Sequence, residues 1–208
     1  ERFHQLAKRA QTVICSSSVT EVGCRPVCDL IDVANAYPDI DIQDLAYLRL
    51  HPWQDLIAEF FDDKHLLEDL FRIRNVEIAT GSDAEAYYLL GWLASRLEWS
   101  ACGKNQMCNR DNEKITFSIR REGDPRRVHR VALMTDATTY TAKVLKDDAG
   151  VASVEVTGHH VANPRFIPIH GLDVAALVGR AIVTHRDAIF HATLVMTKHI
   201  IDAQQVGA

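Results

Sequence analysis

Two pairs of cysteines are the residues in this sequence whose type and spacing could do chemistry. Cys102 and Cys108 are separated by five residues, in a polar stretch that follows a strongly apolar segment. Lys104 and Arg110 favour the thiolate, which is the reactive form of cysteine. A disulfide that closes so short a loop contributes about 2 kcal/mol, which is enough to switch the loop locally. We therefore expect a reducible disulfide between Cys102 and Cys108, with two inert thiols as the alternative.

Cys24 and Cys28 form the second pair, near the expected start of a helix, where the positive end of the dipole lowers a thiol pKa. Inert thiols are again the alternative. A zinc site built from both pairs is a third, although the gap between Cys102 and Cys108 exceeds the roughly two to four residues that zinc sites use. Five cysteines are too few for a secreted disulfide scaffold. Cys15 stands alone as an expected bystander, and we place the chain in the cytoplasm.

Arginines gather around one predicted turn after residue 122. Guanidinium groups bind phosphate and carboxylate groups well, so the cluster is a candidate contact for a phosphorylated metabolite or an acidic protein surface. The alternative is that these arginines only keep an exposed hairpin soluble and bind nothing. The cluster consists of Arg120, Arg121, Arg126, Arg127 and Arg130, with His129 beside them.

Charge and missing motifs exclude several functions. The sequence has 23 Lys and Arg against 28 Asp and Glu, a net charge of −5, which argues against nucleic acid as a partner. It contains neither a glycine-rich phosphate loop nor a nucleophile elbow. His185, His191 and His199 lie six and eight residues apart, whereas ligands on one helical face need three or four. We expect no catalytic residue, no cofactor, no metal and no membrane span, so the chain is not an enzyme.

Hydrophobic periodicity predicts the elements that must position these residues. Apolar residues at helical spacing predict a helix from Pro52 and a buried helix over 83–99, which Ser82 and Glu85 open with a capping box. We expect residues 39–44 to be a surface connection. Further helices are expected over 3–9, 26–36, 66–70, 171–184 and 187–203, and strands over 12–14, 74–79, 114–121, 127–134, 138–145, 151–157 and 164–168.

This order predicts an α+β fold, with an N-terminal mixed α/β portion followed by an antiparallel β-meander that two C-terminal helices cover. Residues 1–100 would form the first portion, 101–113 a cysteine-containing loop and 114–208 the sheet with its helices. All three could also form one continuous domain. Proline at positions 164 and 168 limits the last extended segment to an edge of the sheet.

Three segments resemble a known family. They are Leu48–Ile57 (LRLHPWQDLI), Phe60–Asp62 and Gly91–Leu97 (GWLASRL), the last followed by Trp99. Together they are similar to OpcA, the glucose-6-phosphate dehydrogenase assembly protein of cyanobacteria and actinobacteria. The likeness runs through the whole chain and corresponds to the C-terminal half or more of a longer protein. Since the chain opens at Glu1 without a methionine, we expect a further segment upstream. Glu98 and His51 depart from the residues we would expect in the family, a small residue and a threonine.

The resemblance implies a function without catalysis. It implies a partner that binds glucose-6-phosphate dehydrogenase, raises its activity and so supports the oxidative pentose phosphate pathway. In photosynthetic members the activation depends on thioredoxin, a transient partner, and is strong when the protein is oxidised. The competing hypothesis is a regulatory domain that binds a sugar phosphate or a nucleotide through the arginine cluster.

Overall fold

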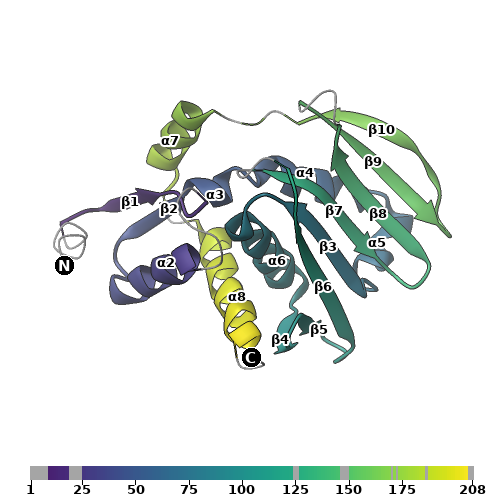
Figure 1. Ribbon diagram of the computed structural model, residues 1–208, viewed down its shortest axis with the longest axis horizontal. Coiled ribbons are helices and arrows are strands. Elements are labelled where there is room, and N and C mark those ends of the chain that lie inside the picture. The colour runs from purple at the N-terminus through teal and green to yellow at the C-terminus, as the bar shows by residue number, and fades with distance from the viewer. Residues whose placement is uncertain are drawn as a thin grey trace.

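The computed structural model describes residues 9–18, 25–123, 127–145, 150–169, 171, 173–185 and 187–205. An eight-stranded sheet forms its centre, in the order β10-β9-β8-β7-β3-β6-β5-β4 (Figure 1). Neighbouring strands run antiparallel except for β3 and β6, which are parallel. The strands are β3 (Asn75–Thr80), β4 (Ser100–Gly103), β5 (Gln106–Cys108), β6 (Lys114–Arg121), β7 (Val128–Met134), β8 (Thr138–Val144), β9 (Val151–Gly158) and β10 (Ala162–Pro168).

Helices and a small second sheet complete the fold, and the predicted α+β class is confirmed. Strands β1 (Thr12–Cys15) and β2 (Asp41–Asp44) pair in parallel. Within the described ranges, none of the helices combines the length and apolarity that crossing a membrane requires. The helices are α2 (Arg25–Ala36), α3 (Leu45–Leu48), α4 (His51–Phe60), α5 (Lys64–Leu70), α6 (Asp83–Leu97), α7 (Val174–Val183) and α8 (Ala188–Gln205).

Alternation along the strands decides which face of the large sheet is buried. On β6, Ile115 and Phe117 are buried while Thr116 and Ser118 are exposed, as their period of two predicts. Helix α6 packs on this sheet at β3 and β6, and α8 packs along α6. The central helix is therefore enclosed between the sheet and α8 (Figure 1).

Residues 39–44 do not form the surface connection that we expected. Residues 41–44 are strand β2, in which Ile42, Gln43 and Asp44 are buried. Acidic composition favours the surface only where the charges lack partners. Here the backbone pairs with β1, and the Asp44 carboxylate receives hydrogen bonds inside the protein.

The arrangement of the sheet differs from the expected meander in its first part. Strands β7 to β10 do form a meander with β10 at the edge, but β3 separates β6 from β7. The sheet therefore crosses the expected boundary between Trp99 and Lys114, since β3 comes from the N-terminal portion. Our expectation that the C-terminal helices cover the meander was wrong, because α8 packs on α6 and β4 while α7 contacts α3 and β1. The helix expected over 3–9 lies almost wholly outside the described residues.

Candidate functional site

A disulfide joins Cys102 on β4 to Cys108 on β5, with 5.9 Å between the two Cα atoms. The segment that we expected to be a loop is thus a β-hairpin at the edge of the large sheet. The strand register shifts between Ala101 and Gly103, and Cys102 between them is exposed. Cys108 is only 7% exposed. A reductant therefore meets the Cys102 end of the disulfide first.

The hairpin is tied to its surroundings on both sides. Met107 is fully buried and pairs with Ile115 on β6, which anchors β5 in the core. Outside the sheet, Arg110 Nε donates a 2.7 Å hydrogen bond to Glu98, and this bond lowers the pKa of that carboxyl. Arg110 was expected to favour a thiolate, but its charge is already paired. The hairpin is thus a small unit whose outer strand, β4, also contacts α8.

Helix α6 leads directly into this hairpin. Its C-cap is Glu98, whose φ of 55° is left-handed, a conformation that favours glycine. Glu98 stands where the resemblance led us to expect a small residue, and the backbone there explains that preference. The ion pair between Glu98 and Arg110 attaches this cap to the segment that follows β5.

The remaining cysteines do not form a second described pair. Cys28 lies half-buried in the first turn of α2, and Cys24 lies outside the described residues, so the pair stays a prediction. Cys15 is half-buried on β1 and donates to the Gln43 carbonyl at 3.6 Å. Burial raises the pKa of the Cys15 thiol far above its usual range, which disfavours reaction.

The arginine cluster is divided between the two faces of the sheet. Arg121 makes two hydrogen bonds to Asp83, at 3.0 and 2.9 Å. Arg130 pairs with Glu77 at 2.9 Å, on the other face. Arg120 and Arg130 both lie opposite Ala79, on strands that flank β3. Arg127 directly precedes β7, and Arg126 lies outside the described residues. Carboxylates thus pair with two members of the cluster, and a role in binding an anion or a partner stays a prediction.

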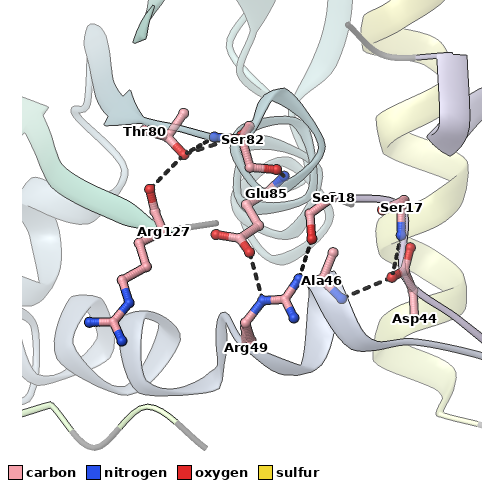
Figure 2. A network of polar contacts seen from close by, with 9 residues as sticks. All are labelled: Ser17, Ser18, Asp44, Ala46, Arg49, Thr80, Ser82, Glu85 and Arg127. Atoms are coloured by element: carbon pink, nitrogen blue, oxygen red, sulfur yellow. Dashed lines mark hydrogen bonds and ion pairs between the residues drawn. The ribbon is translucent and has the colours of Figure 1, made fainter. Parts of the chain in front are cut away.

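A polar network at the other end of α6 was missed by sequence reasoning (Figure 2). Glu85 is 2% exposed and accepts a 2.9 Å hydrogen bond from Arg49, which also donates to the Ser18 hydroxyl. Ser82 caps α6 by accepting from the Glu85 N–H at 3.4 Å. This bond is one half of the predicted capping box. In the other half the Ser82 N–H would donate to the Glu85 carboxylate, but it donates to Thr80 Oγ1 while that carboxylate accepts from Arg49.

Asp44 holds the second part of this network. Its carboxylate accepts from the Ser17 N–H at 3.1 Å, the Ala46 N–H at 2.8 Å and the Tyr88 hydroxyl at 2.7 Å. Burial raises the pKa of Tyr88, so this hydroxyl keeps its proton and remains a donor. The network therefore joins the β1–β2 unit to α6, and α6 joins the network to the disulfide hairpin.

No group of three or more His, Cys, Asp or Glu side chains that could hold a metal occurs in the portion of the chain that the structure describes. His159 and His160 contact each other, with 5.0 Å between ring centroids, while His170 lies outside that portion. His185 is exposed, and His191 and His199 lie on α8.

The fold is similar to that of reductases of known structure. The chain superposes on the 3-ketoreductase KijD10 of Actinomadura kijaniata with a TM-score of 0.58 and 12% identity, covering 95% of this chain and 70% of that one. An oxidoreductase of Desulfitobacterium hafniense gives a TM-score of 0.52 at 10% identity, covering 98% and 73%. At such identities the likeness shows the fold alone.

Comparison with sequences gives a family. A Synechocystis protein named OxPP cycle protein OpcA is 36% identical over 101 residues, which are 47% of this chain and 21% of that protein. Its namesake from Nostoc punctiforme is 40% identical over 103 residues, again 47% and 21%. The match thus spans about a fifth of each relative's length. A family model that describes the C-terminal domain of the glucose-6-phosphate dehydrogenase subunit matches residues 40–194, well over half of the chain. The chain therefore belongs to this family, the OpcA-type C-terminal domain of the glucose-6-phosphate dehydrogenase subunit.

Proposed function

We propose that this chain is the part of an OpcA-type protein that binds glucose-6-phosphate dehydrogenase and raises its activity without catalysing a reaction itself. The family match over residues 40–194 carries the proposal. The names of the cyanobacterial relatives, which refer to the oxidative pentose phosphate cycle, support the same pathway and a cytoplasmic site of action. The reductase-like fold does not argue for catalysis, because likeness at 12% identity carries no residue roles.

The disulfide hairpin is the proposed regulatory site. A thioredoxin thiolate attacks Cys102 Sγ, the exposed end, and Cys108 leaves as a thiolate that takes up a proton. The second thioredoxin thiol then attacks the mixed disulfide, donates its proton and releases Cys102 as a thiol. In sum, two electrons and two protons pass to the chain, and thioredoxin becomes a disulfide.

Reduction would loosen the hairpin without unfolding the domain. Without the disulfide, β4 is held by its short pairing with β5 and by its contact with α8. Met107 stays anchored in the core, so the change is confined to the edge of the sheet. For this change to regulate the dehydrogenase, the oxidised hairpin must bind the enzyme's active conformation more tightly than the reduced one does.

Replacing both cysteines, Cys102→Ser and Cys108→Ser, should make activation of the dehydrogenase insensitive to a dithiol reductant. The wild-type chain should activate strongly when oxidised and several-fold less after reduction. Steady-state dehydrogenase assays at rising chain concentration measure both. The matched control is the Cys15→Ser chain, which keeps the disulfide and should respond to reductant as the wild type does.

Two results would contradict separate parts of this proposal. A Cys102→Ser, Cys108→Ser chain that still responds to reductant would exclude this disulfide as the switch. Failure of the oxidised wild-type chain to activate the dehydrogenase at all would contradict the activator function itself.

A further inference from the structure

A polar pocket of about 510 Å³ opens at the end of the sheet where β7 turns into β8 and β9 turns into β10. Helix α5 and the segment before β3 close its other sides. Arginine, histidine, carboxylate and threonine side chains line it, and Ala137 is its single apolar lining residue among those described. The proposed redox switch does not use this pocket.

Gly158 directly precedes two lining residues of the pocket, His159 and His160. Its φ is 110°, and a Cβ at this position would lie 2.1 Å from the Ala137 carbonyl oxygen. Only glycine allows so close an approach of the two turns. The His159 N–H donates to the same carbonyl at 2.9 Å. These contacts hold His159 and His160 against the turn at 135–138, so this side of the pocket is preformed.

A fixed carboxylate provides the acceptor side of the pocket. Asp69 is 7% exposed and accepts a 2.7 Å hydrogen bond from the Tyr140 hydroxyl. Burial and this hydrogen bond raise the pKa of Tyr140, which therefore remains a donor. His160 Nε2 lies 4.0 Å from the same carboxylate. Two further lining carboxylates are exposed, Asp136 at the tip of the β7–β8 turn and Glu68 on α5.

Arg72 provides the cationic side. Its side chain is 64% exposed, and its contacts with Glu68 and Asp69 are long, at 3.4 and 4.0 Å. Exposed pairs of this kind contribute little, so the guanidinium can turn to a ligand at small cost. Arg74 also lines the pocket, but it is held by Glu113 at 2.7 Å. Arg72 is therefore the principal anion-binding group.

Thr138 lines the pocket and carries a buried hydroxyl. This residue is 2% exposed, and its Oγ1 has no hydrogen-bond partner among the residues that the structure describes. A buried hydroxyl without a partner is costly and uncommon in folded proteins. Because Oγ1 is itself buried, a ligand hydroxyl would satisfy it once the Thr138 side chain rotates toward the pocket.

We propose that this pocket binds a sugar phosphate. Arg72 and His159 would bind the phosphate, since guanidinium and imidazole donors suit its oxygens. Asp69 and Thr138 would bind sugar hydroxyls. A nucleotide fits less well, because its base would have only histidine rings to stack on and the rest of the lining is polar. Inorganic phosphate alone would leave most of the volume empty and would meet carboxylates without gaining the hydroxyl contacts.

Calorimetric titration of the 208-residue chain with glucose 6-phosphate tests the proposal, with inorganic phosphate and glucose as comparison ligands. We expect saturable binding at one site, and binding at least about tenfold weaker for each fragment, since each lacks one set of charged or polar contacts. Equal affinity for inorganic phosphate would overturn the sugar-phosphate proposal, and so would no binding of glucose 6-phosphate.

Two variants locate the site. Arg72→Gln should weaken binding at least about tenfold, the value of one charge-assisted hydrogen bond. Thr138→Val should weaken binding while leaving the free energy of unfolding unchanged or slightly higher, which a purely structural role for the hydroxyl would not produce.

The matched control is Arg120→Gln, which replaces an exposed arginine on β6 outside the pocket, and this variant should bind as the wild type does. Weakening by Arg120→Gln instead would place the ligand at the arginine cluster and overturn the assignment. None of these titrations requires the dehydrogenase, so their failure would leave the activator proposal untouched.

Discussion

Replacing Asp44 with alanine should lower the free energy of unfolding by about 4 kcal/mol, since the change leaves three buried donors without an acceptor. The donors are the Ser17 and Ala46 N–H groups and the Tyr88 hydroxyl. Water cannot replace the carboxylate, because Asp44 and Tyr88 are both 0% exposed. For a domain of this size the loss corresponds to a melting temperature about 10 °C lower, which differential scanning calorimetry measures.

Asp41 offers a matched control on the same strand. Its carboxylate is half-buried and accepts from Gln43 Nε2 at 3.2 Å. Asp41→Ala removes the same atoms from a position that water reaches, so the cost should stay below about 1 kcal/mol. Equal losses from the two variants would show that strand β2 is sensitive to any substitution and that the buried hydrogen bonds of Asp44 are not the cause.

Amphipathic helices could be predicted from the sequence because their pattern is local. The stripe from Trp53 to Phe60 repeats at three and four residues, and its members are buried as the spacing predicts. The same holds for the alternation along β6. In both cases the apolar residues that form the buried face lie within one element, so their spacing in a single sequence is enough to predict that face.

Contacts between distant segments could not be predicted in the same way. The residues Asp44 and Tyr88 lie 44 positions apart, and nothing near either one identifies its partner. An acidic segment therefore looked exposed although its last carboxylate is buried. The insertion of β3 between β6 and β7 is a similar case, because a meander and this order have the same local patterns.

The cysteine hairpin lies between these two situations. The spacing of Cys102 and Cys108 singled out the pair, yet β4 has only four residues and β5 only three, which is too short for hydrophobic alternation to predict a strand. The arginine cluster was drawn from sequence proximity alone, and its role stays a prediction. Sequence proximity placed Arg121 beside Arg120, whereas the period of two in a strand turns them to opposite faces.

Gly91→Ala should lower the free energy of unfolding by about 2 kcal/mol, although glycine to alanine within a helix ordinarily stabilises by up to about 1 kcal/mol. A Cβ on Gly91 would lie 2.1 Å from Thr197 Oγ1 and 2.8 Å from the Thr193 carbonyl oxygen, where α6 meets α8. Thr193 and Thr197 are both fully buried, so α8 must move away to make room. Chemical denaturation measures the loss.

Gly179 on α7 separates this steric effect from helix propensity. A Cβ there meets nothing within 4 Å, so Gly179→Ala should stabilise the chain by up to about 1 kcal/mol. Thr197→Ala added to Gly91→Ala should restore only part of the loss, because the backbone contact at Thr193 remains. If Gly91→Ala proved as favourable as Gly179→Ala, helices α6 and α8 would not be in close contact at this point.

If the loss is observed, it explains why glycine is the first residue of the segment Gly91–Leu97, which resembles the family: α8 must approach α6 closely there. That approach also brings α8 against β4, so the same variant should increase hydrogen exchange in the disulfide hairpin.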